Sequence, residues 1–340
     1  MTVTQTTSTS ACNDSSLDTV PGSVPLTEKI IESVILTAIC LVSITGNVFL
    51  WVVVVCSRKL RTTSNALVLC LSGADLMVSI ANMPITVVTI VYGEWVLGSA
   101  WCSVFGFTSM VNFIASVMSL GAISVNRFIL ISYPHHFRSV YNKKGTAAMI
   151  LGVWLLACCL ASPPLFGWAE YDYLPNQSFC FCKWRSSISY TVFMIVLCFG
   201  GPCCIMLFSY ASIWNTVRRS RQRVEANNAK EAAAIDRERV RRKREEDMKL
   251  TKLFLVVIAA FVLAWLPFCI TMVLGVVSPN LLSPVVEMTT LLLGYCNSCC
   301  NPIIYGVMNR RFTEEFMATL CIRGRPGDND TVHAITNAQP

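Results

Sequence analysis

The sequence has few charged residues and few histidines. Charged side chains make up 14% of its 340 residues, against about 25% in an average soluble domain. The histidines are His135, His136 and His333, so a histidine-based metal or hydrolytic centre is disfavoured. The longest polar stretch, residues 218–252, is too short to bury a core of its own. A large soluble domain is therefore excluded.

What the chain has is long apolar blocks. Each meets the length of roughly 20 residues that a helix needs to cross a bilayer. The seven blocks cover residues 30–56, 65–92, 99–126, 146–167, 188–214, 253–277 and 285–308. We therefore expect an all-α membrane protein, a seven-transmembrane helix bundle over residues 30–308.

Lysine and arginine are distributed unevenly between the connecting segments. With the N-terminus outside, 24 of the 27 basic residues lie inside, and only Lys29, Lys183 and Arg185 lie outside. This asymmetry fits the positive-inside rule. The glycosylation sequons at Asn13 and Asn176 also fall outside. We expect a multi-pass plasma-membrane protein with an extracellular N-terminus and a cytosolic C-terminus.

The two ends of the chain are polar. Residues 1–29 are rich in serine and threonine and show no cleavable signal peptide, so we expect a disordered extracellular tail. Residues 322–340 are expected to form a disordered cytosolic tail. A third sequon, at Asn329, would then lie inside and stay unmodified.

Most of the 17 cysteines lie inside the apolar blocks, where they act as small hydrophobic residues. Cys102 differs because it lies at the outer end of the third block. Cys180 and Cys182 lie in the outer loop between the fourth and fifth blocks. Because the exterior is oxidising, we expect Cys102 to form a disulfide with one of these two cysteines. That bond would tie the loop across the mouth of the bundle.

Asp75 is the only acidic residue deep in an apolar block. An intramembrane charge costs a few kcal/mol or more and usually has partners and a function. The candidate partners are Asn47, Asn112, Ser116, Asn297, Ser298 and Asn301. These oxygen-rich side chains suit a small hard cation or water. Alternatively, they only hold the helices together, although an acid and several amides at one depth favour the functional interpretation.

Arg127 closes the third block, where a snorkelling arginine at the membrane interface is one explanation. Residues 229–252 have charge pairs at helical spacing, so we expect them to extend the sixth helix into the cytosol. Glu246 or Asp247 near the membrane is a candidate partner for Arg127. Local pairing of these acids within the loop is the alternative.

Short motifs follow one another along the blocks. They are Gly46-Asn47, Leu71 with Ala74-Asp75, Trp95, Cys102, Asn126-Arg127-Phe128, Trp154, Pro202, Tyr210, Phe261, Trp265, Pro267, Asn301-Pro302-Ile303-Ile304-Tyr305 and Phe312. In this order they resemble the rhodopsin-like (class A) G-protein-coupled receptors over nearly all of residues 30–320. The resemblance implies a short amphipathic eighth helix, assigned to residues 309–321, and a receptor rather than an enzyme.

The resemblance also implies roles for particular residues. An extracellular ligand would bind among Ser109, Asn112, Phe113, Trp184, Met194, Trp265, Phe268 and Tyr295. An allosteric sodium ion would bind Asp75, Ser116, Asn297, Ser298 and Asn301. The activation switch and G-protein contact would involve Asn126, Arg127, Phe128, Tyr210, Asp247, Asn301, Pro302 and Tyr305. By similarity to opsins, Cys182 is the expected partner of Cys102. Cys321 is a candidate for palmitoylation, or simply a spare cysteine near the membrane.

Departures from the family pattern restrict the chemical class of the expected ligand. Ser109 stands where amine receptors have an aspartate, so an amine lacks its counter-ion. Tyr295 stands where opsins have their Schiff-base lysine, so we expect no covalent cofactor. Asn126 replaces an acid beside Arg127, which favours basal activity. The Asn-Arg-Phe and Asn-Ser-Cys motifs resemble melatonin receptors most, although Pro302 and Pro163-Pro164 depart from them. A small, neutral, non-amine ligand is expected.

The expected partners follow from the inner face. Its 24 basic and 11 acidic residues give a net charge of +13, which suits anionic membrane lipids and a heterotrimeric G protein. Arrestin is a further expected partner, and nucleic acid is not. An ion-coupled transporter or channel is the alternative, because an intramembrane acid also fits an ion path. Against it, the two halves of the chain show no internal repeat.

Overall fold

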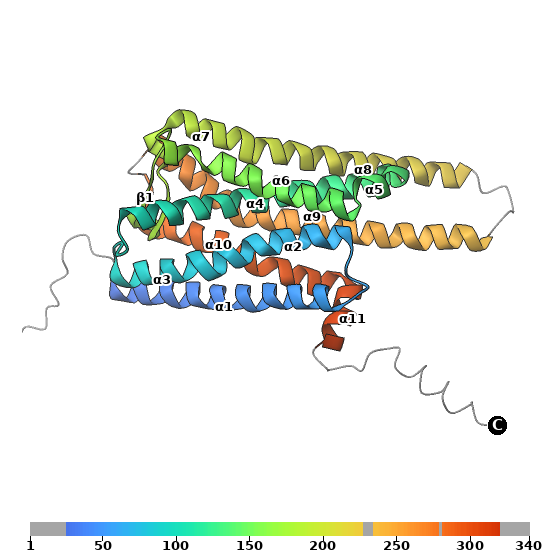
Figure 1. The fold of residues 1–340 in the computed structure, drawn as a ribbon, viewed down its shortest axis with the longest axis horizontal. Helices are drawn as coiled ribbons and strands as arrows, with labels where there is room; N and C mark the ends of the chain where they lie inside the picture. Colours follow the sequence, from blue (N-terminus) through green and yellow to red (C-terminus); the bar gives the residue numbers. More distant parts are fainter. Residues whose placement is uncertain (1–24, 227–233, 279–280, 320–340) are drawn as a thin grey trace, which may run out of the picture.

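The structure is a computed structural model that describes residues 25–226, 234–278 and 281–319. Within these residues, seven long helical segments lie side by side in one bundle (Figure 1), which confirms the expected fold. They are α1 (Leu26–Cys56), α2 (Thr63–Met77) continuing into α3 (Met83–Tyr92), α4 (Ser99–Ser132), α6 (Lys143–Ala161), α7 (Ile188–Met194) continuing into α8 (Gly201–Ala226), α9 (Ala234–Val277) and α10 (Pro284–Met308).

Two of these segments contain a π-helical turn. Val78–Asn82 (η1) joins α2 to α3, and Ile195–Gly200 (η5) joins α7 to α8. A π turn adds a residue to the helical repeat and rotates the side chains that follow it. Neither turn could be expected from the sequence. Asn82, the last residue of η1, lines the principal cavity of the bundle.

Six helical segments of the described chain are long and apolar enough to cross a membrane. The seventh, α10, has 25 residues but carries Asn297, Ser298, Asn301 and Pro302 in its middle. These residues lower its mean hydropathy. Because α10 packs inside the bundle, its polar residues face other helices and not lipid: Asn297, Ser298 and Asn301 are all buried.

Local sequence explains where several helices begin and end. The side chains of Thr62, Asn142 and Ser187 accept hydrogen bonds from backbone N–H groups in the first turns of α2, α6 and α7. Gly93 ends α3 in a left-handed conformation with φ of 80°, which glycine adopts without steric cost. Pro267 and Pro302 lie inside α9 and α10, where each removes one backbone donor.

The connection between α6 and α7 contains a hairpin that the sequence analysis did not anticipate. Strands β1 (Tyr171–Leu174) and β2 (Phe179–Cys182) pair antiparallel, with Tyr171 opposite Cys182 and Tyr173 opposite Cys180. Short 3₁₀ turns surround them at Pro163–Phe166, Pro175–Gln177 and Trp184–Ser186. The hairpin lies at one end of the bundle (Figure 1), called here the hairpin end.

The opposite end carries α5 (Pro134–Val140) and α11 (Arg310–Thr319), and we call it the α11 end. Phe312 of α11 is buried, and Phe316 packs edge-on against Phe49 with ring centroids 4.2 Å apart. α9 begins at Ala234, as the expected extension of the sixth helix requires. The fifth helix also extends, to Ala226, so the predicted loop over 218–252 is largely helical.

Candidate functional site

A cavity of about 30 Å³ lies in the hairpin half of the bundle. Sites for drug-sized ligands measure roughly 300–1,000 Å³, so this cavity has room only for water or a small ion. Its lining is Asp75, Val78, Asn82, Ser109, Asn112, Phe113, Ser116, Phe179, Phe181, Trp265, Phe268, Leu291, Tyr295, Asn297 and Ser298. A ligand larger than water therefore needs a wall of the cavity to move.

Two smaller cavities of about 10 Å³ each adjoin this one. One shares Phe113, Phe181 and Phe268 with it and also contacts Trp184 and Met194. The other shares Asn82, Ser109 and Phe179. All eight residues predicted for the ligand pocket line the first or the second cavity.

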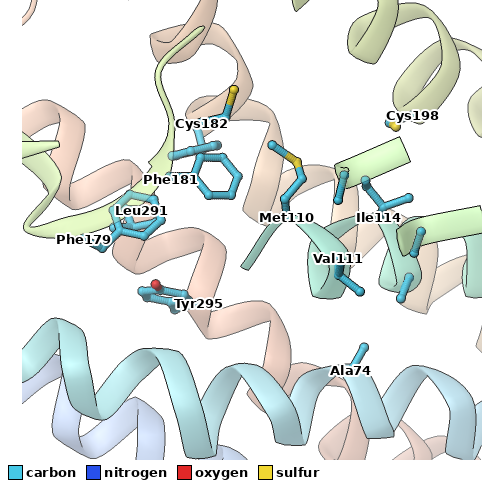
Figure 2. Packing of buried hydrophobic residues seen from close by; sticks show 14 of the residues in the cluster. Ala74, Met110, Val111, Ile114, Phe179, Phe181, Cys182, Cys198, Leu291 and Tyr295 are labelled. Atoms are coloured by element: carbon cyan, nitrogen blue, oxygen red, sulfur yellow. The ribbon is translucent and has the colours of Figure 1, made fainter. Parts of the chain in front are cut away.

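The wall that closes the pocket is strand β2. Phe179 and Phe181 are 6% and 5% exposed, and their rings stack with centroids 5.2 Å apart. Figure 2 shows them beside Leu291 and Tyr295 of α10. Neither phenylalanine was among the residues predicted for the ligand pocket. The alternation Phe179-Cys180-Phe181-Cys182, beside an expected disulfide, was the signal for a strand that puts both rings on one face.

The hairpin is hydrogen-bonded to α10, and an ion pair within the loop holds the hairpin itself together. The side chains of Asn176 and Gln177 donate to the carboxylate of Glu287 in α10, at 3.2 and 3.3 Å. Lys183 Nζ donates to Asp172 Oδ2 at 2.9 Å. This bond holds the pKa of the Asp172 carboxyl below its usual range. The hairpin is therefore tied to α10 and places β2 as a lid over the cavity.

The disulfide joins Cys102 to Cys180, with Cα atoms 5.3 Å apart, so the pairing of Cys102 with Cys182 was wrong. The register of the hairpin explains the difference. Tyr171, the cross-strand partner of Cys182, packs against Gly106 of α4, where a Cβ would lie 2.7 Å from its ring. Gly106 is one helical turn beyond Cys102. Cys180, two residues before Cys182, therefore lies level with Cys102.

Asp75 forms the floor of the first cavity and is 2% exposed. Its Oδ2 accepts from Asn301 Nδ2 at 2.7 Å, and its Oδ1 accepts from Ser298 Oγ at 3.2 Å. Ser116 and Asn297 line the same cavity. The structure thus brings together all five residues predicted for sodium.

Two amides near Asp75 have unused hydrogen-bonding atoms. Asn297 Oδ1 is buried and has no hydrogen-bond partner among the described residues, and the same holds for both amide atoms of Asn112. A carboxylate with amide and hydroxyl oxygens is the donor set that hard cations prefer. The residues present therefore fit a small cation better than a purely structural network, whose polar atoms would bond one another.

Pro302 explains the remaining polar residues of α10. A proline has no N–H, so the carbonyl four residues earlier, at Ser298, loses its helical donor. Asn47 Nδ2 of α1 donates to that carbonyl at 2.9 Å. Ser72 Oγ of α2 in turn donates to Asn47 Oδ1 at 2.7 Å. The interrupted helix is thus stabilised by its neighbours.

Aromatic side chains in edge-on contact connect the lid to α9. Phe181 lies 6.2 Å from Phe268, and Phe268 lies edge-on to Trp265 at 5.6 Å between ring centroids. Trp265 also contacts Phe113 of α4 at 5.1 Å and Phe261 at 6.4 Å. A shift of the lid would therefore act on α9 through packed rings.

The predicted switch residues lie toward the α11 end. Arg127 is 2% exposed, and its guanidinium lies over the ring of Phe254 of α9, 4.6 Å from the centroid. Tyr305 packs on the same ring at 5.9 Å, and its hydroxyl is buried without a hydrogen-bond partner among the described residues. Phe254 thus links α4 and α10 to α9.

The other predicted switch residues are nearby. Asn126 Oδ1 accepts from Ser64 Oγ of α2 at 3.0 Å. Phe128 packs edge-on against Tyr133 and Phe208. Tyr210 is half-buried in α8. The side chain of Asp247 lies outside the described residues, as do Asn13 and Cys321, whereas Asn176 is exposed on the hairpin.

Comparisons with known proteins agree with this arrangement. Residues 46–305 match the family described as 7 transmembrane receptor (rhodopsin family). The chain is 30% identical to 5-hydroxytryptamine receptor 7 of Xenopus laevis, over 85% of this chain and 76% of the relative. It is 29% identical to melatonin receptor type 1B-B of Danio rerio, over 81% of this chain and 77% of the relative.

Squid rhodopsin has the same fold, with a TM-score of 0.82 over 96% of this chain and 98% of that chain, at 22% identity. The sequence relatives are receptors and not enzymes, transporters or channels, so the transporter alternative is not supported. The family match covers most of the bundle, including the cavity and the Arg127 site. The chain belongs to the rhodopsin family of seven-transmembrane receptors.

Proposed function

We propose that this receptor binds a small, neutral, non-amine ligand in the cavity beneath β2 and activates a heterotrimeric G protein at the α11 end. The main support for this proposal is the position of the cavity. It touches Trp265 and Phe268 of α9 and Tyr295 of α10, and the same two helices supply Phe254 and Tyr305 beside Arg127. A ligand that repacks these helices favours a second arrangement at the far end.

The chemistry of the lining supports a neutral ligand. Apart from Asp75, the side chains that line the first cavity carry no charge, and both carboxylate oxygens of Asp75 are already hydrogen-bonded. Ser109 and Tyr295 supply hydroxyl groups where an amine or a retinal Schiff base would need an acid or a lysine. The similarity to the melatonin receptor fits this proposal better than the similarity to the serotonin receptor, whose name denotes an amine.

This function assigns each end of the bundle to one side of the membrane. The hairpin, with the sequon at Asn176, faces the extracellular space, and the α11 end faces the cytosol of a plasma-membrane receptor. The basic inner segments contact anionic lipids and the G protein. Arrestin would bind the same end. The sodium ion would be held by Asp75, Ser116, Asn297, Ser298 and Asn301, and would stabilise the closed arrangement by its charge.

The experiment that tests the proposal is basal G-protein activation in cells that express the chain, across the major Gα classes. Arg127→Ala is the control, because it removes the cation that packs on Phe254 without touching the cavity. Basal activation that disappears in this variant identifies the coupled G protein and supplies the readout for ligands. Activation of equal size in both proteins would contradict coupling through this end of the bundle.

A further inference from the structure

Asn82 is a polar residue of the pocket that the sequence analysis did not single out. It is the last residue of the π turn η1 and is 5% exposed. π turns in α-helices are frequent at functional sites because they redirect side chains. Here Asn82 lines the first cavity, between α2–α3 and α4.

The amide of Asn82 is only half satisfied. Its Nδ2 donates to Ser109 Oγ of α4 at 2.5 Å. Its Oδ1 is buried and has no hydrogen-bond partner among the described residues. Ser109 thus fixes the orientation of the amide and leaves its carbonyl oxygen available. A buried acceptor without a donor is unfavourable, so a group that donates to it gains affinity.

Asn82 also lies where two cavities meet. The cavity of about 30 Å³ and one of about 10 Å³ are both lined by Asn82, Ser109 and Phe179. The smaller one continues along the aromatic side chains of Trp95 and Phe105. Phe179 therefore belongs to the wall shared by two spaces that both reach this free acceptor, and displacement of its ring would join them.

We propose that Asn82 is the recognition point of a ligand subsite beneath Phe179, which selects uncharged aromatic molecules with an N–H or O–H donor. This inference rests on the proposed function of the cavity. The walls of the subsite supply aromatic surface, and no basic side chain is among its described lining residues. Asn82 Oδ1 accepts the donor, Ser109 holds the amide, and Phe179 moves to admit the ring.

The test uses indole and benzofuran, which have nearly the same size and shape but differ in that only indole has an N–H. The full-length Phe179→Ala variant is purified in nanodiscs, since removal of the ring joins the two spaces. Binding is measured as the rise of the thermal midpoint with probe concentration. We expect indole to bind Phe179→Ala roughly tenfold more tightly than benzofuran, the effect of one hydrogen bond. The wild-type protein should bind both probes more weakly.

Two variants in the Phe179→Ala background provide the control. Asn82→Leu keeps the approximate size and removes the acceptor, so the preference for indole should fall below about twofold. Thr86→Val alters a side chain of the same smaller cavity, whose hydroxyl donates to the backbone carbonyl of Asn82 at 3.0 Å and also hydrogen-bonds with the Tyr295 side chain, but does not contact the Asn82 amide. It should keep the preference and shows that a nearby polar-to-apolar change alone does not remove it.

Equal binding of the two probes, no binding of either, or a preference that survives Asn82→Leu would overturn the proposal. The assay contains no G protein, so a failure of coupling does not affect it. Conversely, a receptor that couples but shows no preference for indole would keep the proposed function and lose only this subsite.

Discussion

Gly294 of α10 lies directly against the indole ring of Trp265 in α9. A Cβ at residue 294 would lie 2.8 Å from Trp265 Cζ3 and 2.9 Å from Cε3, closer than non-bonded carbon atoms normally approach. The indole cannot move away easily, because Phe113 and Phe268 pack against it edge-on. The absence of a side chain at residue 294 therefore sets how closely α9 and α10 approach beside the cavity.

The substitution Gly294→Ala should destabilise the receptor by about 1–3 kcal/mol, because it forces a rigid ring or a helix to shift. The intrinsic helix propensity of alanine acts in the opposite direction by at most about 1 kcal/mol. Thermal unfolding of the purified protein measures the net effect. Gly306→Ala in the same helix is the matched control, because outside the adjoining helix backbone no atom of the described residues lies within 4 Å of the added Cβ. Equal midpoints for the two variants would show that the contact is not tight.

The hydrogen bond from Asn47 to the Ser298 carbonyl makes a second prediction. Asn47→Ala leaves that buried carbonyl without a donor and removes the acceptor of Ser72. We expect a loss of about 1–3 kcal/mol in the free energy of unfolding.

A double-mutant cycle with Pro302→Ala tests the reason for that loss. Alanine at residue 302 restores a backbone N–H four residues after Ser298, so the carbonyl regains a helical donor. Asn47→Ala should then cost less in the Pro302→Ala background than in the wild type, by about 1 kcal/mol. Strict additivity would mean that Asn47 does not replace the donor that Pro302 lacks.

Much of the fold could be predicted from the sequence, because the physics of a bilayer is simple. A span must be apolar and must satisfy its backbone groups internally, so each helix appears as a long apolar block. The same rule makes buried polar residues conspicuous, and Asp75, Asn297, Ser298 and Asn301 do lie together.

The parts that the sequence did not predict depend on register and not on polarity. The hairpin of β1 and β2 lies in a short connection without a long alternating pattern. Cys180 and Cys182 alternate with Phe179 and Phe181 and so lie on the same face of the strand. Only the contact of Tyr171 with Gly106 decides between the two cysteines. Asn82 was not predicted as a pocket residue, because its orientation depends on the π turn at Val78–Asn82. A regular apolar helix pattern gives no reason to expect such a turn.

The disulfide between Cys102 and Cys180 predicts which of two cysteine variants loses more surface expression. Cys180→Ala removes the bond to Cys102 and should reduce surface expression strongly, since loss of a native disulfide typically costs about 2–5 kcal/mol. Cys182→Ala removes only a buried thiol, with a loss of about 1 kcal/mol. Burial raises the pKa of that thiol to about 12, so it stays protonated at neutral pH and does not attack the neighbouring disulfide.

Flow cytometry of an N-terminally tagged receptor, together with a thiol count on the intact protein, measures both effects. Cys102→Ala should match Cys180→Ala in both measurements, because the two variants break the same bond. A more severe loss in Cys182→Ala than in Cys180→Ala would restore the pairing that the resemblance to opsins implied.

The proposed ion site predicts that sodium lowers basal signalling. A cation beside Asp75 would cross-link α2, α4 and α10 through oxygens of Asp75, Ser116 and Asn297, and would therefore favour the closed bundle. Asp75→Asn keeps the size of the side chain and removes its charge. Because interactions with a charged group contribute about 1.5–3 kcal/mol, the sodium concentration for half-maximal effect should rise more than tenfold or the effect should vanish.

Basal nucleotide exchange in membranes, with potassium replacing sodium at constant ionic strength, measures this dependence. A sodium response that persists unchanged in Asp75→Asn, or that potassium reproduces, would place the ion elsewhere and leave Asp75 as a structural partner of Asn301 and Ser298.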